Sequence, residues 1–566
     1  MLEIPWRGAL GLPTVAVLRR AILLVPLAGA CLGSSDALAQ AQPAVVTMDR
    51  AGGVLRPARV QAWLDAIYGT QRAPVWFTAD GPRTDVQVAL DAMRHAADHG
   101  LEPDDYNVDA VQSAVRQAAD MTETQTVAAT DAALTMAVLR FMSDLRFGRV
   151  DPSTVAPRYR ATPPKDMRFV NMLRSAVAEA RLADLLRAVE PAFPQYRRLE
   201  ALLARYRRLA QEPFAALPLP KVGKRSVAVG DDYEGVAQLY DRLRGLGDLD
   251  ATTPPPGGPR YTEAIAVGVR RFQHRHGLDA DGVLGKSTLA ALDVSPERRA
   301  TQIVVSLERL RWVPDFGNDA IIAINLPSFR LWTFGDASRD HADLAMPVIV
   351  GKAMRNETPV FIGTMRLVEF SPYWNVPRSI LRNELLPQLM RDRSLLRRDD
   401  MELVDASGQA SSSDVLDDAA LAALQAGRLR VRQRPGPANA LGRVKFVLPN
   451  TMDIYLHDTP ATQLFERSRR DFSHGCIRVG DPAALAAFVL SGNGGWTRAD
   501  VDAAMSAGMH RVVPLAAPVP VIVFYTTVIV DRDGQAWFLP DLYGQDTVLL
   551  RALRRASPGF GSRPAP

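Results

Sequence analysis

The chain has 566 residues, of which 47% are hydrophobic and 23% charged, with a formal net charge of +5. Its length excludes a single hydrophobic core and predicts two to four domains, and its composition agrees with a globular protein. No basic run is interleaved with aromatic residues, which argues against a nucleic-acid partner, and after the first forty residues no apolar run is long enough to cross a bilayer.

The first 39 residues have the pattern of a signal peptide. The basic pair Arg19-Arg20 precedes an apolar run at 21–32, and the small-residue sequence Ala37-Leu38-Ala39 follows it. This order is typical of cleaved secretory signals. We therefore expect residues 1–39 to be removed during export. The alternative is a retained membrane anchor, although the apolar run is shorter than a membrane span.

The cysteine count draws attention to one thiol. The sequence contains only Cys31 and Cys476, and Cys31 belongs to the expected signal peptide. Cleavage therefore leaves one thiol and no internal disulfide. An unpaired cysteine in an oxidising compartment is either a buried small hydrophobe or a reactive group, and the residues around Cys476 favour the reactive group.

From about residue 54 to 217, apolar residues recur at steps of three to four, which predicts α-helices. The clearest of these helices carries the apolar positions Leu134, Val138, Phe141, Met142 and Leu145. Gly148 and Pro152 follow it and are expected to end it. We expect a helical scaffold domain at 40–229.

Residues 230–295 predict a smaller unit of three short helices. Apolar positions at 236–246 and 265–272 mark two helices, and 287–292 is the third. The unit resembles a three-helix peptidoglycan-binding domain in Val269-Arg270-Arg271-Phe272-Gln273, His276-Gly277-Leu278, Asp281-Gly282, Gly285 and Thr288. The resemblance implies a wall-binding module, and a helical spacer is the alternative.

From residue 319 the pattern changes, because apolar residues predict strands at 321–325, 331–334, 344–350, 358–370, 444–448 and 453–456. Residues 378–430 are rich in leucine and charge, and they predict a helical insertion that is a candidate lid. We expect a linker at 296–318 and a mostly β domain at 319–500. A C-terminal segment at 501–566 should pack on the scaffold or on the β domain, with a strand near 519–530 that packs back on the scaffold.

His457 and the sequence Ser473-His474-Gly475-Cys476 contain the groups that acyl transfer needs. Cys476 is a candidate nucleophile, His457 is a base for its proton, and the turn at His474 and Gly475 leaves backbone N–H groups free for an oxyanion. A thiol with a pKa of about 8.5 is only a few per cent ionised at neutral pH, so a neighbouring imidazole matters. This chemistry implies neither a metal nor an organic cofactor.

The spacing of these residues resembles a known signature. A histidine nineteen residues before the cysteine of Ser-His-Gly-Cys is similar to the pattern of YkuD-type L,D-transpeptidases. The order, with histidine first, argues against the NlpC/P60-type endopeptidases, in which cysteine comes first. The chain also resembles the large, scaffold-bearing L,D-transpeptidases of Gram-negative bacteria in the segments 371–378, 435–442, 455–460 and 541–544.

We therefore expect a multidomain α+β fold: a helical scaffold, a small three-helix peptidoglycan-binding-like module, and a mostly β L,D-transpeptidase catalytic domain with a helical insertion. The resemblance implies a reaction on peptidoglycan stem peptides. Cys476 would attack the third, diamino-acid residue of a tetrapeptide donor and release the terminal D-alanine. The side-chain amine of a diamino-acid acceptor would then resolve the thioester and give a 3→3 cross-link.

Further candidates for substrate binding are Arg478, Trp374, Tyr373, Asn439 and Tyr455. Arg478 could position a substrate carboxylate, or it could be a structural arginine bonded to the turn. Trp374 and Tyr373 could line the groove for the stem peptide or pack beside their neighbouring prolines. Asp458 could orient His457 or cap the following turn.

Three functions remain open. The first is an L,D-transpeptidase. The second is an L,D-carboxypeptidase or cross-link hydrolase on the same fold, because water can resolve the same thioester. The third is a noncatalytic wall-binding scaffold, which the presence of all the catalytic residues disfavours. Export through the expected signal peptide predicts a periplasmic location, with membrane anchoring as the alternative. The resemblance also implies a glycan synthase as a candidate partner and acylation of Cys476 by carbapenems.

Overall fold

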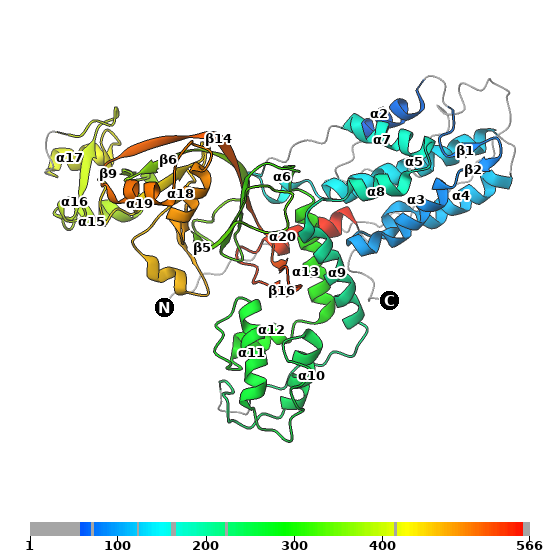
Figure 1. Ribbon diagram of the computed structural model, residues 1–566, viewed down its shortest axis with the longest axis horizontal. Helices are drawn as coiled ribbons and strands as arrows, with labels where there is room; N and C mark the ends of the chain where they lie inside the picture. Colours follow the sequence, from blue (N-terminus) through cyan, green and yellow to red (C-terminus); the bar gives the residue numbers. More distant parts are fainter. Residues whose placement is uncertain are drawn as a thin grey trace, which may run out of the picture.

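The computed structural model describes residues 57–69, 73–120, 124–159, 166–220, 225–411 and 416–557. Figure 1 shows three arms that meet near helix α13 (Pro296–Leu310): a helical arm, a small arm of three helices, and a larger arm built on a β-sheet. The signal peptide expected at 1–39 lies outside the described residues. None of the described helices is both long and apolar enough to span a membrane.

The helical arm has its own hydrophobic core. It consists of α2 (Pro57–Tyr68), β1 (Phe77–Thr78), β2 (Gly81–Pro82), α3 (Asp85–Arg94), η1 (His95–His99), η2 (Pro103–Tyr106), α4 (Val108–Asp120), α5 (Thr124–Phe147), α7 (Asp166–Ala178) and α8 (Leu182–Val189). The five apolar positions predicted for the clearest helix are all buried in α5. As predicted, that helix ends at Gly148, whose φ of 83° requires glycine.

The three helices of the small arm are α10 (Val236–Leu246), α11 (Glu263–Arg275) and α12 (Lys286–Leu292). The side chain of Gln273 holds the loop before α12. Its Nε2 donates to the carbonyl of Val283 (3.0 Å) and to Oγ1 of Thr288 (3.1 Å), and its Oε1 accepts from the N–H of Gly282 (2.8 Å). The motif residues that carry the resemblance therefore have structural roles in the loop.

The small arm is packed on the rest of the chain and is not merely tethered to it. Arg275 is buried, pairs with Asp248 (Nε to Oδ1, 2.6 Å), and donates to a backbone carbonyl of the hairpin at 528–538. The ring of His276 stacks against Phe538 of the same hairpin, with 5.8 Å between centroids. Buried polar and aromatic contacts therefore set the position of this module.

Nine strands form the sheet of the large arm: β3 (Ile321–Asn325), β4 (Arg330–Phe334), β5 (Leu344–Gly351), β6 (Phe361–Phe370), β10 (Val444–Val447), β11 (Leu456–His457), β12 (Asp471–Ser473), β13 (Ile477–Val479) and β14 (Arg511–Phe524). Their order is β12-β5-β13-β11-β10-β6-β14-β3-β4, and β4 also pairs with β5. The sheet therefore closes on itself, which removes most of its exposed edges.

Short helical segments accompany the sheet: η4 (Thr462–Glu466), α18 (Pro482–Leu490) and α19 (Arg498–Ser506). Asp481 caps α18, because its side chain accepts a hydrogen bond from the N–H of Ala484 (2.9 Å) and Pro482 occupies the first helical position. An Asp-Pro pair is a helix-start signal that the sequence itself carries, and the helix begins at this pair.

The insertion forms a lobe with a separate core. Its elements are β7 (Trp374–Asn375), α14 (Arg378–Ile380), the π-helical turn η3 (Leu381–Leu385), α15 (Leu386–Leu389), α16 (Leu395–Arg398), β8 (Met401–Val404), α17 (Asp418–Gln425) and β9 (Arg430–Gln433). The helices predicted at 378–430 are present. A three-stranded sheet, ordered β7-β9-β8, was not predicted, because these strands are too short to give a clear alternating pattern.

The linker expected at 296–318 is wrong, because residues 296–310 form the buried helix α13. Ser295 caps this helix and Pro296 occupies its first position, which are helix-start signals in the sequence. Helix α13 packs against α9 (Pro194–Leu209) and α20 (Gln545–Ala556). Helix α9 therefore shares a core with α13 and the sheet rather than with the scaffold helices.

The boundary expected at residue 500 is also wrong. Strand β14 lies within the sheet, antiparallel to β6 and parallel to β3, so residues 511–524 belong to the β domain. The last part of the strand expected at 519–530, residues 528–530, contacts α9 of the expected scaffold. The chain then forms a hairpin of β15 (Val528–Val530) and β16 (Ala536–Phe538) before α20. Pairing between β3 and β14 joins residues about 200 positions apart, and such pairing leaves no local signal.

Glu308 connects the helical arm to α13. Its side chain has no exposed area, and its Oε1 accepts hydrogen bonds from the backbone N–H groups of Arg149 (2.5 Å) and Val150 (2.9 Å). Arg311 lies 3.2 Å from Oε2. A side chain on Gly148 would reach within 2.5 Å of this carboxylate. The end of α5 is therefore joined to α13 by a buried charge.

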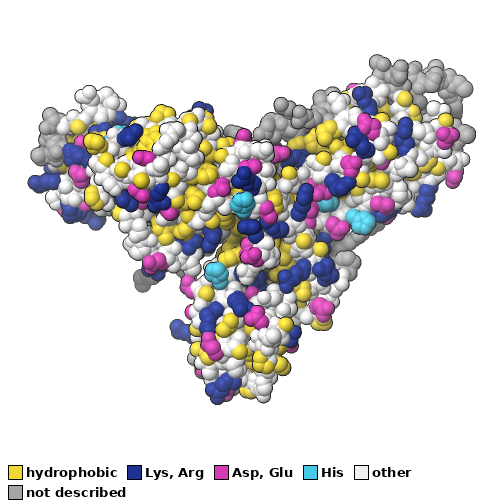
Figure 2. Space-filling view, viewed as in Figure 1, with side chains coloured by type: hydrophobic (Ala, Val, Ile, Leu, Met, Phe, Trp, Pro, Cys, Tyr) yellow, Lys and Arg dark blue, Asp and Glu magenta, His cyan; other side chains and the backbone are white. Residues whose placement is uncertain are grey.

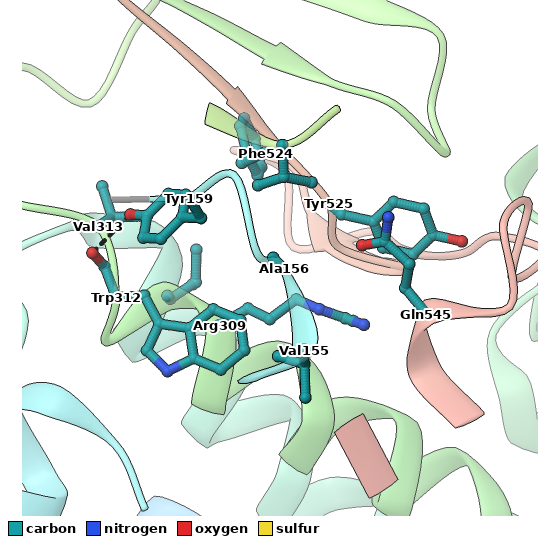
Figure 3. Close-up of a pocket in the computed structure, with 11 residues that line it drawn as sticks. Val155, Ala156, Tyr159, Arg309, Trp312, Val313, Phe524, Tyr525 and Gln545 are labelled. Carbon is teal, nitrogen blue, oxygen red and sulfur yellow. Dashed lines mark hydrogen bonds between the residues drawn. The ribbon is translucent and has the colours of Figure 1, made fainter. Parts of the chain in front are cut away.

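The junction retains a small cavity beside α13, remote from Cys476. Figure 3 shows Tyr159, Trp312, Phe524 and Tyr525 around it, with the Tyr159 hydroxyl donating to the carbonyl of Trp312 (2.6 Å). Over the face shown in Figure 2, basic and acidic side chains are interspersed, in keeping with the modest net charge. Neither feature indicates a charged ligand at the junction.

We predict that Glu308→Ala destabilises the protein by about 3–5 kcal/mol, because it leaves buried arginines and two backbone N–H groups without their carboxylate. Glu297→Ala, at an exposed position of the same helix, should change stability by less than about 0.5 kcal/mol. Urea unfolding followed by tryptophan fluorescence measures both variants. Equal unfolding midpoints for the two would contradict this role of Glu308.

Candidate active site

Strands β11 and β13 bring His457 and Cys476 together. The two strands pair in parallel, with Leu456 opposite Ile477 and His457 opposite Arg478. The N–H of Ile477 donates to the carbonyl of Tyr455 (3.0 Å). Because Cys476 immediately precedes β13, it lies beside Tyr455 at the start of β11. Both residues line one cavity of about 240 Å³.

Six of the residues expected at the site line this cavity: Cys476, His457, His474, Arg478, Trp374 and Tyr455. Gly475 lies in the turn between His474 and Cys476. Tyr373 and Asn439 are outside the lining. The ring centroid of Tyr373 lies 4.2 Å from Cζ of Arg432 and 5.4 Å from the ring centroid of His510. Asn439 is buried and holds its own loop, with Nδ2 donating to the carbonyls of Pro372 and Arg434.

His457 is held as a neutral base. Its Nδ1 lies 2.5 Å from the carbonyl oxygen of Asp458, and because a carbonyl only accepts, Nδ1 carries the proton and Nε2 has a free lone pair. Burial, followed by the positive charge of Arg478, lowers the pKa of His457 to about 3. The imidazole is therefore uncharged at neutral pH and can accept a proton.

The side chain of Asp458 caps a turn and does not contact His457. Its Oδ1 accepts from the N–H of Thr459 (2.7 Å) and its Oδ2 from the N–H of Arg443 (2.8 Å). Gly442 leaves space for it, because a Cβ there would lie 2.4 Å from the carboxylate. The backbone carbonyl of Asp458, and not its carboxylate, therefore orients the imidazole.

Cys476 is half-buried, and its thiol lies 3.5 Å from the carbonyl of Asp453. Burial raises the pKa of the thiol, while hydrogen bonds from Tyr455 and the charge of Lys445 oppose this shift. The resting site therefore combines a neutral thiol with a neutral imidazole. As the thiol loses its proton, the negative charge on sulfur favours the imidazolium, so His457 becomes a stronger base when it is needed.

The turn before Cys476 leaves the backbone N–H of the nucleophile itself available. Gly475 has a φ of 120°, which favours glycine, and its N–H donates to Oγ of Ser473 (3.2 Å). Oγ of Ser473 in turn donates to the carbonyl of Cys476 (2.5 Å). Among the described residues the N–H of Cys476 has no hydrogen-bond partner. It is therefore the available donor for an oxyanion at the nucleophile.

His474 faces the insertion. Its Nε2 lies 2.6 Å from Oε1 of Glu384 on the π-helical turn η3, and Ile380 and Asn383 of the same lobe also line the cavity. The insertion therefore forms one wall of the site. The sequence did not point to Glu384, because helical spacing shows only which residues share a face and not what that face contacts.

Arg478 is mostly buried beside the cavity, and within the described part of the chain its Nε has no hydrogen-bond partner. Burial lowers the pKa of this guanidinium, and the neighbouring Cys476 opposes the shift. The side chain lines the cavity, and a guanidinium there is suited to a substrate carboxylate. The alternative role, a structural arginine bonded to the turn, is not supported by Nε, because Nε makes no hydrogen bond to a described residue.

We predict that the rate of alkylation of Cys476 by iodoacetamide rises about tenfold per pH unit from pH 6 to above pH 8.5. A raised thiol pKa keeps the thiolate fraction small over this range. The rate is measured by intact mass. The same thiol in protein unfolded by guanidinium should reach its plateau near its ordinary pKa of about 8.5. A plateau below pH 8 in the folded protein would indicate a preformed thiolate–imidazolium pair instead.

Comparison with known proteins identifies three domain types. Residues 62–203 match the model of a scaffold domain, residues 232–292 match that of a "Putative peptidoglycan binding domain", and residues 319–521 match that of the YkuD L,D-transpeptidase catalytic domain. The third match continues past residue 500 into β14, in agreement with the strand order of the sheet.

A "Putative L,D-transpeptidase" of Haemophilus influenzae is 33% identical over 256 residues, which are 45% of this chain and 50% of that protein. The chain thus spans about half the length of this curated relative. A crystal structure of an L,D-transpeptidase from Xylanimonas cellulosilytica is 16% identical over 55% of this chain and 100% of that chain, with a TM-score of 0.17 that supports no comparison of folds. On the three domain matches, the chain carries a YkuD-family L,D-transpeptidase catalytic domain together with a scaffold domain and a peptidoglycan-binding domain.

Proposed function

We propose that this protein is a peptidoglycan L,D-transpeptidase that forms 3→3 cross-links through a thioester on Cys476. The observation that carries the proposal is one cavity in the matched catalytic domain that is lined by a thiol and a neutral imidazole, together with the N–H of Cys476, which has no partner among the described residues. These are the nucleophile, the base and the oxyanion donor of cysteine acyl transfer.

In the first half of the proposed reaction, the sulfur of Cys476 attacks the carbonyl carbon of the third residue of a tetrapeptide stem. Nε2 of His457 takes the thiol proton, and the carbonyl oxygen becomes an oxyanion near the N–H of Cys476. The C–N bond to the terminal D-alanine then breaks, and His457 returns the proton to the leaving amine. A thioester remains on Cys476.

In the second half, the side-chain amine of a diamino-acid residue on a neighbouring stem attacks the thioester. His457 accepts a proton from this amine, the C–S bond breaks, and the thiol recovers its proton. A carboxylate of the donor stem peptide is a candidate ligand of Arg478. Trp374 and Tyr455 offer apolar surface beside the thiol. We place the acceptor on the side of the cavity that the insertion lines through Ile380 and Asn383.

We further propose that the protein acts in the periplasm after cleavage of residues 1–39, where the peptidoglycan-binding module would hold it on its polymeric substrate. The export pattern in the sequence supports the location, and the matched module supports the substrate. The packing of Arg275 and His276 on the hairpin at 528–538 would fix the angle between module and catalytic domain. A glycan synthase that supplies new stems is a candidate partner.

We predict that purified protein converts tetrapeptide-bearing muropeptides into cross-linked dimers, and that Cys476→Ala abolishes them. His457→Ala should lower the rate by about 10²–10⁴-fold, because the general base is lost. His341→Ala, at an exposed position outside the cavity, is the matched control and should retain activity. Mass spectrometry of the products measures all four proteins.

The products also separate the alternatives. Tripeptide without dimer would replace the transferase by a carboxypeptidase, in which water resolves the thioester. Cleavage of added dimers would indicate a cross-link hydrolase. If the wild type turns over no substrate, a noncatalytic wall-binding scaffold is the function that remains. Unchanged turnover by Cys476→Ala would rule out the thioester mechanism.

We also predict a covalent adduct between Cys476 and a carbapenem. Attack on the β-lactam carbonyl opens the strained ring, and the departing nitrogen stays attached to the acyl group, so it hinders the approach of water or an amine. Intact mass should increase by the mass of one carbapenem in the wild type and not in Cys476→Ala. An adduct of equal yield in both proteins would show that the acylated group is not Cys476.

A further inference from the structure

The peptide between Gly475 and Cys476 is held from the interior of the domain by Thr358. Oγ1 of Thr358 donates a hydrogen bond to the carbonyl of Gly475 (2.8 Å) and accepts one from the N–H of Gly351 (2.8 Å). Thr358 has no exposed area. Its hydroxyl therefore has a fixed donor and a fixed acceptor, and it holds the Gly475 carbonyl in one direction.

This contact also sets the direction of the Cys476 N–H. In a planar trans peptide the C=O and the following N–H point to opposite sides. Because the Gly475 carbonyl points to buried Thr358, the N–H of Cys476 points away from it, and it has no partner within the part of the chain that the structure describes. The preceding N–H, on Gly475, is occupied by Ser473.

We propose that Thr358 is a positioning residue that aims the N–H of Cys476 at the oxyanion formed when the Cys476 thiol attacks a carbonyl. The inference deepens the proposed function and rests on it for the class of reaction, acyl transfer to a cysteine. Thr358 does not touch the substrate. It acts through the Gly475 carbonyl, and a flip of that peptide would direct a carbonyl toward the developing negative charge instead of a donor.

A second layer supports Thr358. The hydroxyl of Tyr543 donates to the carbonyl of Gly351 (2.6 Å) and accepts from the N–H of Thr358 (3.4 Å). Gly351 has no space for a side chain, because a Cβ would lie 2.0 Å from the carbonyl oxygen of Asn356. The close approach of these two segments places the Thr358 hydroxyl between Gly351 and Gly475. Tyr543 thus links the chain after the sheet to the nucleophile turn.

Two reactions of the same thiol separate positioning from a merely structural role. Attack on p-nitrophenyl acetate forms a C–S bond, moves the carbonyl electron pair to oxygen, and then expels p-nitrophenolate, so it needs an oxyanion donor. Alkylation by iodoacetamide forms a C–S bond at a saturated carbon and expels iodide, with no charge on an oxygen. Both reactions depend equally on the thiol losing its proton.

The experiment compares Thr358→Val, Thr358→Ser and the wild type in both reactions. Thr358→Val keeps the shape and removes the hydroxyl, and we expect acylation to fall at least about tenfold, toward the 10²–10³-fold cost of losing an oxyanion donor. The rate of alkylation of Thr358→Val should stay within about twofold of the wild-type rate. Thr358→Ser restores the hydroxyl and should recover acylation.

Thr333→Val is the matched control. Thr333 lies in β4 of the same sheet, is equally buried, and its Oγ1 has no hydrogen-bond partner among the described residues. It should leave both rates within about twofold of wild type. If Thr358→Val does not fold, Tyr543→Phe tests the same chain of contacts, with a smaller loss of acylation of about two- to fivefold and unchanged alkylation.

Equal acylation by wild type and folded Thr358→Val would overturn the inference. A parallel fall of acylation and alkylation would do the same, because it would show a general disturbance of the thiol. Alkylation without acylation in the wild type would also overturn it, since no working oxyanion donor would then exist. Selective loss in Thr358→Val, in a protein that makes no muropeptide product, would support the inference while the proposed function fails.

Discussion

A short parallel pairing between β11 and β13 is the constraint on which the site depends. Parallel neighbours cannot be joined by a tight turn, so the chain leaves the sheet after His457 and returns through β12 before it enters β13. This return places Cys476 beside Tyr455, at the start of β11. Backbone hydrogen bonds of a closed sheet, and not flexible side chains, therefore set the distance between nucleophile and base. A slip of one residue would turn His457 to the opposite face of the sheet.

Burial determines the charge state of the resting site. It raises the pKa of the Cys476 thiol and lowers that of His457, so both groups are neutral in the same cavity. A preformed ion pair would lose solvation there, whereas a neutral pair separates charge only when a substrate carbonyl is attacked. The carbonyl of Asp458 fixes the imidazole tautomer without adding a negative charge beside the thiol. The geometry thus favours concerted proton removal over storage of a reactive thiolate.

The site is also continuous with the other arms of the molecule. Glu308 joins the helical arm to α13, α13 packs on α9 and α20, and Tyr543, just before α20, contacts the segment that holds Gly475. On the opposite side, Glu384 of the insertion pairs with His474. The nucleophile turn is therefore held between the chain that follows the sheet and the lobe inserted into it, so both can influence its geometry through direct contacts.

The sequence by itself determined the features that depend on neighbouring residues. The helical stripe of α5, the cap at Asp481, the glycine turn before Cys476 and the order of the two catalytic candidates were all readable, because each rests on residues close along the chain. Only the tertiary structure decided that residues 296–310 form a central helix and that β14 belongs to the sheet. It also placed Thr358 behind Gly475 and kept Tyr373 and Asn439 out of the cavity lining. These contacts join segments far apart in the sequence, where periodicity and spacing carry no information about which faces meet.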